Sequence, residues 1–381
     1  MMKQPIKGRP DYLLLLLTLS LVSIGMVTIF SASAGVVAVR YDNPWHYAAR
    51  QGLFAIAGLL TMFICMAIPY RTWKKAAPIL ILTALGLLLL VSLIGTPVNG
   101  ARRWISIASF QFQPTEFAKL ALIIYLAALI SNKEERIASF KRGLLPILIV
   151  VGLLLALIML QPDFGTALLF VMIAITMIVI GGAHPGQLAM LGAGLIPICL
   201  LLAFGKSYRI NRLVSYLNPL DHASGTGYQL VQSLYAFAHG GALGTGLGHG
   251  VQKYFYLPEA HTDFIFAVIG EEFGLVGALF VIMLFVLYLG CGFRAALRSE
   301  DTFGVLLAAG IVTMIGTQIL LNLGAVTGTL PVTGMPLPFI SYGGSSLLLC
   351  MASTGILLSI TRDMNKRAVL SEHPNSRKKR K

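Results

Sequence analysis

Charged side chains are scarce in this chain of 381 residues. Only 12% are Asp, Glu, Lys or Arg, whereas 56% are hydrophobic and the mean hydropathy is +0.80. Because soluble globular domains carry about 25% charged residues, this composition excludes an ordinary soluble fold. We therefore expect a single integral membrane domain over residues 1–381.

Cysteine and recognisable cofactor motifs are also sparse. The four cysteines lie in apolar segments and form no C-x-x-C pair, so neither a zinc site nor a disulfide framework is indicated. There is no H-E-x-x-H or P-loop sequence, and the glycine-rich residues 240–250 lack the preceding strand of a dinucleotide-binding motif. Any chemistry must therefore lie in or beside the membrane.

Long apolar runs are what the sequence has instead. Ten of them reach about the 20 residues that a helix needs to cross a membrane, which predicts an all-α polytopic protein with ten transmembrane helices. The first run resembles a signal peptide, but its apolar core exceeds the roughly 7–15 residues of such a signal, so we expect it to be retained. The predicted helices cover residues 12–38, 48–68, 77–95, 115–131, 144–160, 164–182, 186–205, 263–292, 303–327 and 338–361.

The distribution of basic residues predicts the orientation. With both termini in the cytoplasm, most of the 29 lysines and arginines fall on the cytoplasmic side, in short loops and in the tail 362–381, as the positive-inside rule requires. The net charge of +14 is then explained by attraction to anionic membrane lipids. A nucleic-acid partner is not expected.

One connection, residues 206–262 between the seventh and eighth predicted helices, is much longer than the others. Loops of that length are usually functional or disordered, and the aromatic residues in this one favour an ordered structure along the membrane surface. Residues 229–239 are predicted to form a short amphipathic interfacial helix.

Cationic side chains occur on the predicted outer side, where the positive-inside rule disfavours them. Guanidinium groups bind phosphate through two parallel hydrogen bonds, so a lipid headgroup or a diphosphate fits them. The alternative is that each residue anchors the chain at the membrane interface, and only their clustering favours a binding site. The candidates are Arg102, Arg103 and Trp104, together with Lys206, Arg209 and Arg212 at the start of the long loop.

Two helix starts carry charge. Glu116 and Lys119 lie three residues apart on one helix face and are expected to pair. Such a pair is costly within a membrane unless it faces protein or water, so it either lines a cavity or is a structural salt bridge. Asp163, in the sequence QPDFGTA, is expected to cap the next helix by accepting backbone N–H bonds or to line the same cavity.

Two irregular segments complete the candidate site. Three prolines precede Ser341 and Ser345 in residues 331–346, and irregular backbone at membrane depth is tolerated only where it is buried or lines a cavity. Glu259, His261 and Asp263 cluster at the start of the eighth predicted helix. Asp263 is either an N-cap or a catalytic base opposite the cationic patch.

Two more carboxylates follow that cluster. Glu271 lies eight residues beyond Asp263, roughly 12 Å further along a regular helix, and Glu272 follows it. Both are expected to be structural or to line a cavity.

Several motifs occur in an order that resembles the SEDS family (shape, elongation, division and sporulation), whose members include FtsW, RodA and SpoVE. PEAHTDF with Ala260, together with GYQLVQS, is more similar to the FtsW/SpoVE division branch than to RodA. The motifs are NGARRWI (99–105), FQPTEFAKL (112–120), QPDFGTA (161–167), GYQLVQSLYA (227–236), LPEAHTDFIFAVIGEEFG (257–274) and PVTGMPLPFISYGGSS (331–346).

The resemblance implies a ten-helix fold and a peptidoglycan glycosyltransferase. Such an enzyme polymerises lipid II, a disaccharide-pentapeptide on undecaprenyl diphosphate, at the outer face of a bacterial cytoplasmic membrane. A class B penicillin-binding protein, a transpeptidase, is its implied partner. Asp263 matches the family's essential aspartate, Glu116 and Lys119 its ion pair, and Arg102, Trp104 and Asp163 other residues of its polar cavity.

The substrate suggests a mechanism. The α-linked donor and the β-linked product require inversion, with Asp263 as general base for the acceptor hydroxyl and outer cations stabilising the departing diphosphate. Whether a divalent cation, Mg²⁺ or Mn²⁺, bridges phosphate oxygens is left open. Two alternatives remain: a lipid II flippase, which would need polar groups across the whole membrane, and a scaffold without catalytic activity.

Overall fold

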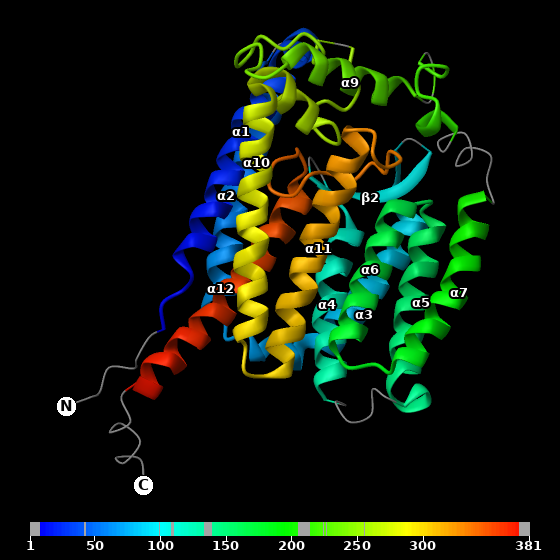
Figure 1. Ribbon diagram of the computed structural model, residues 1–381, viewed down its shortest axis with the longest axis vertical. Coiled ribbons are helices and arrows are strands. Elements are labelled where there is room, and N and C mark those ends of the chain that lie inside the picture. Colours follow the sequence, from blue (N-terminus) through cyan, green and yellow to red (C-terminus); the bar gives the residue numbers. More distant parts are fainter. Residues whose placement is uncertain are drawn as a thin grey trace.

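The computed structural model describes residues 8–372 apart from 42, 99, 108–109, 133–138, 205–213, 224, 226 and 255. Its long helices run side by side as a bundle, and the short helix α9 (Tyr228–Gly240) lies across one end (Figure 1). We call this the α9 end. The bundle helices are Tyr12–Tyr41 (α1), His46–Ala67 (α2), Arg71–Ile94 (α3), Pro114–Ser131 (α4), Leu145–Leu160 (α5), Phe164–Ile180 (α6), Pro185–Phe204 (α7), Ile265–Arg298 (α10), Thr302–Val326 (α11) and Gly344–Glu372 (α12), with a π-helical turn, Phe140–Leu144, before α5.

Most of these helices are suited to a membrane. Eight segments among the described residues are long and apolar enough to cross one, and α6 is an apolar helix of 17 residues. Large apolar side chains on the bundle surface, such as Ile79 (69% exposed) and Leu82 (67%), have no protein to cover them. The helical membrane architecture is therefore confirmed, and the count of ten spans stays a prediction.

The two ends of the described chain meet at the end of the bundle opposite α9 (Figure 1). The Asn365 side chain donates to the carbonyl of Arg9 (2.7 Å), and the amide of Asp11 donates to Thr361 Oγ1 (3.2 Å). Both ends thus share one side of the bundle. Their cytoplasmic placement stays a prediction.

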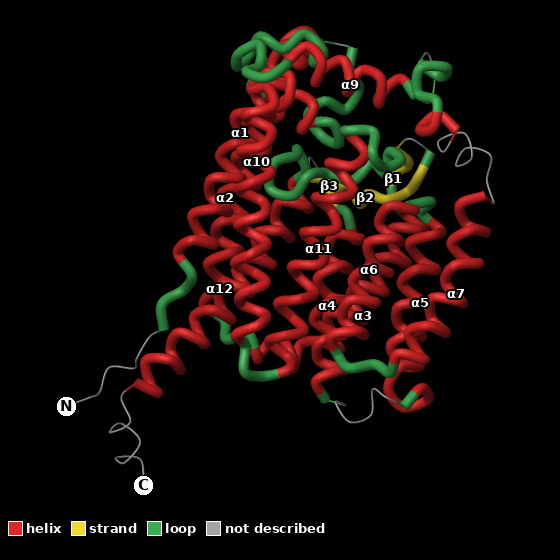
Figure 2. The backbone as a smooth tube through the Cα atoms, viewed as in Figure 1, coloured by secondary structure: helices red, strands yellow, loops and turns green. Residues whose placement is uncertain are grey.

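A small antiparallel sheet departs from the all-α prediction. Strands β1 (Thr96–Val98), β2 (Ala101–Ile107) and β3 (Phe110–Phe112) pair in chain order between α3 and α4, towards the α9 end (Figure 2). Gly100 makes the first turn at φ 77°, a left-handed conformation that glycine adopts without steric cost. The sequence prediction missed the strands because it searched for runs long enough to cross a membrane.

Helix α10 is broken near the α9 end. Gly274 has φ 67° and ψ −166°, and residues 241–246 pack against the break, where the amide of Leu275 donates to the carbonyl of Gly241 (3.0 Å). The loop backbone thus replaces partners that the helix lacks, as buried backbone groups require. A Cβ atom at Gly274 would lie 2.4 Å from the amide nitrogen of Gly244, so only glycine fits.

Helix α9 confirms the helix predicted over residues 229–239. Leu230, Val231 and Ala236 are buried, whereas Tyr235 is 52% exposed, so the helix is amphipathic. The Ser233 hydroxyl donates to the carbonyl of Val326 (2.7 Å). This bond ties α9 to the end of α11.

Candidate functional site

Asp263 lies at the α9 end, just before α10. The helix begins at Ile265, and its cap position is occupied by Phe264, which provides no side-chain cap. The N-cap alternative for Asp263 is therefore wrong by one residue. Asp263 is only partly buried, unlike Phe264 and the first residues of α10.

The backbone of Asp263 is held from α11. The buried Asn322 side chain donates to the carbonyls of both Asp263 (2.8 Å) and Met335 (2.7 Å). A Cβ atom on Gly334 would lie 3.5 Å from Asp263 Oδ2, so the carboxylate faces the loop of residues 331–336. Sequence reasoning missed Asn322, although an amide within an apolar helix is itself a signal.

Asp263 lies within a tight turn formed by residues 259–264. Glu259 has φ 56°, a conformation that costs a non-glycine residue on the order of 1–3 kcal/mol. Its carbonyl accepts from the amides of Thr262 (3.1 Å) and Phe264 (3.2 Å), and its carboxylate accepts from the Thr262 hydroxyl (2.7 Å). The Glu259 carboxylate is thus engaged in shaping the turn.

His261 belongs to an aromatic cluster. Its ring stacks on Tyr47 (centroids 4.6 Å apart, 17° between planes) and lies 5.7 Å from Tyr342. Burial lowers the pKa of His261, and the charge of Glu259 opposes that shift. The imidazole therefore stays neutral at pH 7 and orients the turn through packing.

The predicted polar wall of residues 331–346 packs against this turn. The Ser341 hydroxyl donates to the carbonyl of Thr262 (2.6 Å) and accepts from the amide of Leu337 (2.8 Å). Ser345 Oγ accepts from the amide of Gln113 (3.2 Å). Gln51 of α2, which sequence reasoning missed, donates to the Ser341 carbonyl (3.3 Å). Both serines thus join segments that are distant in sequence.

The pair Glu116–Lys119 is confirmed. Lys119 Nζ donates to Glu116 Oε1 (2.7 Å), and the two side chains are 1% and 7% exposed. The second oxygen of Glu116 has no hydrogen-bond partner among the described residues. Two buried charges are stable together only when they are closely paired. Because this pair is both buried and close, we interpret it as a structural salt bridge.

Arg103 links the sheet to the turn between α5 and α6. Its guanidinium donates to the carbonyls of Gln161 (2.9 Å) and Pro162 (2.6 Å) and lies 3.9 Å from Asp163. Asp163 caps α6 as predicted, by accepting from the amide of Thr166 (3.1 Å). Arg103 and Asp163 therefore each use part of their hydrogen-bonding capacity in contacts that stabilise the fold.

Of the remaining candidates on the predicted outer side, the structure describes only Arg102 and Trp104. Arg102 is exposed and donates one bond, to the carbonyl of Leu93 (3.1 Å), while Trp104 is partly exposed and opposite Thr96 in the sheet. The other three lie outside the described residues: Lys206, Arg209 and Arg212.

Glu271 and Glu272 are structural, as predicted. Lys253, which sequence reasoning missed, donates to Glu272 (2.5 Å) and to the Ser31 hydroxyl (2.9 Å). Glu271 Oε1 lies 2.9 Å from His239 Nδ1. These bonds attach α9 to α10, and the segment after α9 to both α10 and α1.

A protein-made metal site is not formed by the described residues, since no three His, Cys, Asp or Glu side chains among them gather closely enough to hold an ion. The residues around Asp263 thus do not by themselves fit a metal centre. A role for Mg²⁺ or Mn²⁺ stays a prediction.

Known proteins match this chain over most of its length. The profile of the family described as "Cell cycle protein" (FTSW_RODA_SPOVE) matches residues 11–366. The chain is 43% identical over 358 residues to stage V sporulation protein E of Bacillus subtilis, covering 93% of this chain and 98% of that protein. It is 41% identical to the probable peptidoglycan glycosyltransferase FtsW of Geobacter metallireducens, covering 93% and 96%.

Two solved structures share the fold. A chain of a peptidoglycan synthase complex that coordinates polymerization and crosslinking has a TM-score of 0.78 and 30% identity, with 93% of this chain and 98% of that chain covered. The rod shape determining protein RodA of Thermus thermophilus has a TM-score of 0.70 and 29% identity, with 93% and 97% covered. The relatives named FtsW and SpoVE are thus closer in sequence than this RodA, as the branch prediction expected. The chain belongs to the FtsW/RodA/SpoVE family of bacterial membrane proteins, in which the motifs of its sequence had placed it.

Proposed function

We propose that this protein is an inverting peptidoglycan glycosyltransferase that polymerises lipid II at the outer face of the bacterial cytoplasmic membrane. Its family and its similarity to probable glycosyltransferases support the activity. The observation that carries the proposal is the position of Asp263 at the α9 end, where the residue is only partly buried, its backbone carbonyl accepts from Asn322 and its carboxylate faces Gly334. In this proposal the α9 end faces outward and both termini are cytoplasmic.

Asp263 acts as the general base. It accepts the proton of the acceptor's 4-hydroxyl, whose oxygen attacks the anomeric carbon of the donor as the bond to the diphosphate breaks. The diphosphate leaves with the bonding electrons and, unlike the leaving group of a glycosidase, needs no proton. The neutral His261 ring and the Glu259 turn position Asp263 rather than react.

The cations divide into two groups in this mechanism. Arg102, exposed and bound to one carbonyl, is available to stabilise the negative charge of the diphosphate, with Trp104 in the adjacent strand. Arg103 has two bonds to carbonyls and positions the sheet instead. Lys206, Arg209 and Arg212 are proposed to complete the diphosphate site.

The buried contacts support positioning roles for the other predicted site residues. Glu116 and Lys119 fix α4, and Asp163 fixes the start of α6. Ser341 and Ser345 hold the 331–346 segment against its neighbours. We expect substitutions of these residues to disturb stability together with activity.

A transpeptidase partner is supported by the solved relative, which comes from a complex that coordinates polymerization and crosslinking. We propose a class B penicillin-binding protein in that role. The membrane lipids around the bundle are the other partner.

The test is polymerisation of labelled lipid II by the purified protein with its partner. Asp263→Asn is expected to fold, to bind the partner and to make no glycan, whereas Asp221→Asn, which changes an exposed aspartate in the same long loop, should be fully active. Glycan made at the normal rate by Asp263→Asn would remove Asp263 from the mechanism. Lipid II translocation in vesicles by an inactive Asp263→Asn variant would favour the flippase instead.

A further inference from the structure

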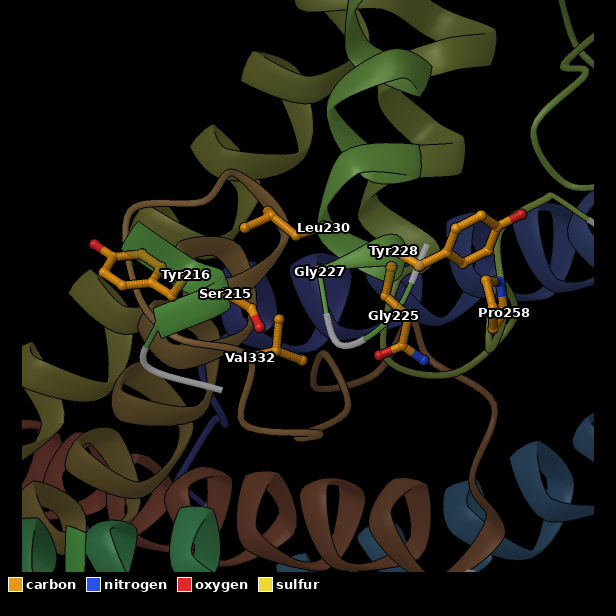
Figure 3. Close-up of a pocket in the computed structure, with 9 residues that line it drawn as sticks. Ser215, Tyr216, Gly225, Gly227, Tyr228, Leu230, Pro258 and Val332 are labelled. Carbon is orange, nitrogen blue, oxygen red and sulfur yellow. The ribbon is translucent and has the colours of Figure 1, made fainter. Parts of the chain in front are cut away.

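A pocket of about 320 Å³ opens among the loops at the α9 end. Figure 3 shows Tyr228 and Pro258 on one side of it and Ser215, Tyr216 and Val332 on the other. Its volume falls within the roughly 300–1,000 Å³ of small-molecule sites. None of the reactive groups assigned above lines this pocket.

The part of the lining that the structure describes is neutral, aromatic and polar. The described lining residues include two tyrosines, one serine and one glutamine, and none of them is charged. A diphosphate would need cations, and an acyl chain would need a wholly apolar wall. Flat aromatic faces beside hydroxyl and amide groups instead match a ligand that has apolar C–H faces and many neutral hydrogen-bonding groups, such as an N-acetylated sugar.

Two polar groups of the lining are available to a ligand. The Tyr216 hydroxyl is already bound to the carbonyl of Thr329 (2.8 Å), which fixes one wall. Within the described residues, by contrast, the Tyr228 hydroxyl and the Gln229 side-chain amide form no bond. Gln229 offers two donors and an acceptor, enough to recognise an acetamido group.

The pocket adjoins the reacting centre. Val332 lies two residues before Gly334, whose Cβ position is 3.5 Å from Asp263 Oδ2, and two residues of chain span at most roughly 7 Å. Pro258 begins the segment that leads to Asp263 itself. The segment that leads to Asp263 and the segment that its carboxylate faces therefore both contribute residues to the pocket walls.

We propose that this pocket is a glycan subsite, which binds a neutral N-acetylated sugar one or two units from the sugar that reacts at Asp263. The inference rests on the proposed function and assigns to Tyr228 and Gln229 the recognition of that sugar. The subsite holds the growing glycan strand in register between successive additions of lipid II.

Binding of chitotetraose, a soluble tetramer of N-acetylglucosamine, to the purified full chain tests the subsite without any turnover. Tyr228→Ala and Gln229→Ala should each weaken binding about tenfold, the loss of a few contacts worth roughly 1.4 kcal/mol. Tyr228→Phe keeps the ring and should lose less. Tyr235→Ala, on the same helix but exposed and outside the pocket, is the matched control and should bind normally.

In polymerisation of lipid II, Tyr228→Ala should raise KM about tenfold, lower kcat less and shorten the glycan product. Absence of chitotetraose binding by the wild type, or unchanged binding by Tyr228→Ala, would overturn the proposal. A pocket that binds the free pentapeptide and not the sugar would overturn it too. Since binding is measured without lipid II, a failure of Asp263→Asn to stop polymerisation would refute the catalytic role and leave the subsite result separate.

Discussion

Loss of the Lys253 charge should strongly destabilise the α9 end. Lys253 Nζ bonds Glu272 and Ser31, and both charged side chains are at most 2% exposed. Lys253→Met keeps the stem but leaves the Glu272 carboxylate buried without a counter-charge. Breaking a buried pair in this way costs about 3–5 kcal/mol.

The double variant Lys253→Met with Glu272→Leu gives the decisive comparison. With both charges replaced by apolar groups, most of the stability should return, since such replacement of a buried pair is often neutral. Thermal unfolding in detergent measures both, with Lys75→Met, an exposed lysine, expected to stay within about 0.5 kcal/mol of the wild type. A stable Lys253→Met variant, or a double variant no better than the single one, would refute the buried-pair reasoning.

Three further outcomes can be measured. Gly274→Ala should prevent proper folding because its Cβ would collide with loop backbone. Gly290→Ala, with open space around its Cβ, should change stability by no more than about 1 kcal/mol. The yield of monodisperse protein distinguishes the two variants. Asn322→Ala leaves two carbonyls without their donor, at about 1–3 kcal/mol each, and should lower the polymerisation rate and the melting temperature together; a normal rate would contradict the role of Asn322 in holding Asp263. The folded-state pKa of His261 lies below its ordinary value of 6.5, so the unfolded chain binds more protons and stability should fall as the pH drops below about 6.5. His261→Gln should weaken this dependence of the melting temperature on pH. An equal dependence in both proteins would refute the contribution of His261.

The features predicted correctly from the sequence are local ones. Long apolar runs mark α-helices because a membrane helix must satisfy its backbone within itself. The spacing of three residues brings Glu116 to Lys119 on one helix face, as observed. The cap at Asp163 likewise depends on a bond to Thr166, three residues away.

The capping alternative for Asp263 was wrong for a structural reason. The Glu259 turn extends through Phe264 and so delays the start of α10 by one residue. A left-handed φ at Glu259 cannot be foreseen from residue type, because isolated glutamate disfavours it.

The sequence by itself thus determined an apolar helical membrane protein, its motifs and the residue types of its site, since hydropathy and helix spacing act over a few neighbouring residues. Only the tertiary structure decided that Asn322 holds Asp263 across 59 residues of chain, or that Lys253 is paired with Glu272. Contacts of this kind depend on which loop backbone meets which helix, and that is fixed by the packing of the whole bundle, where leaving a buried charge or amide unpaired costs free energy.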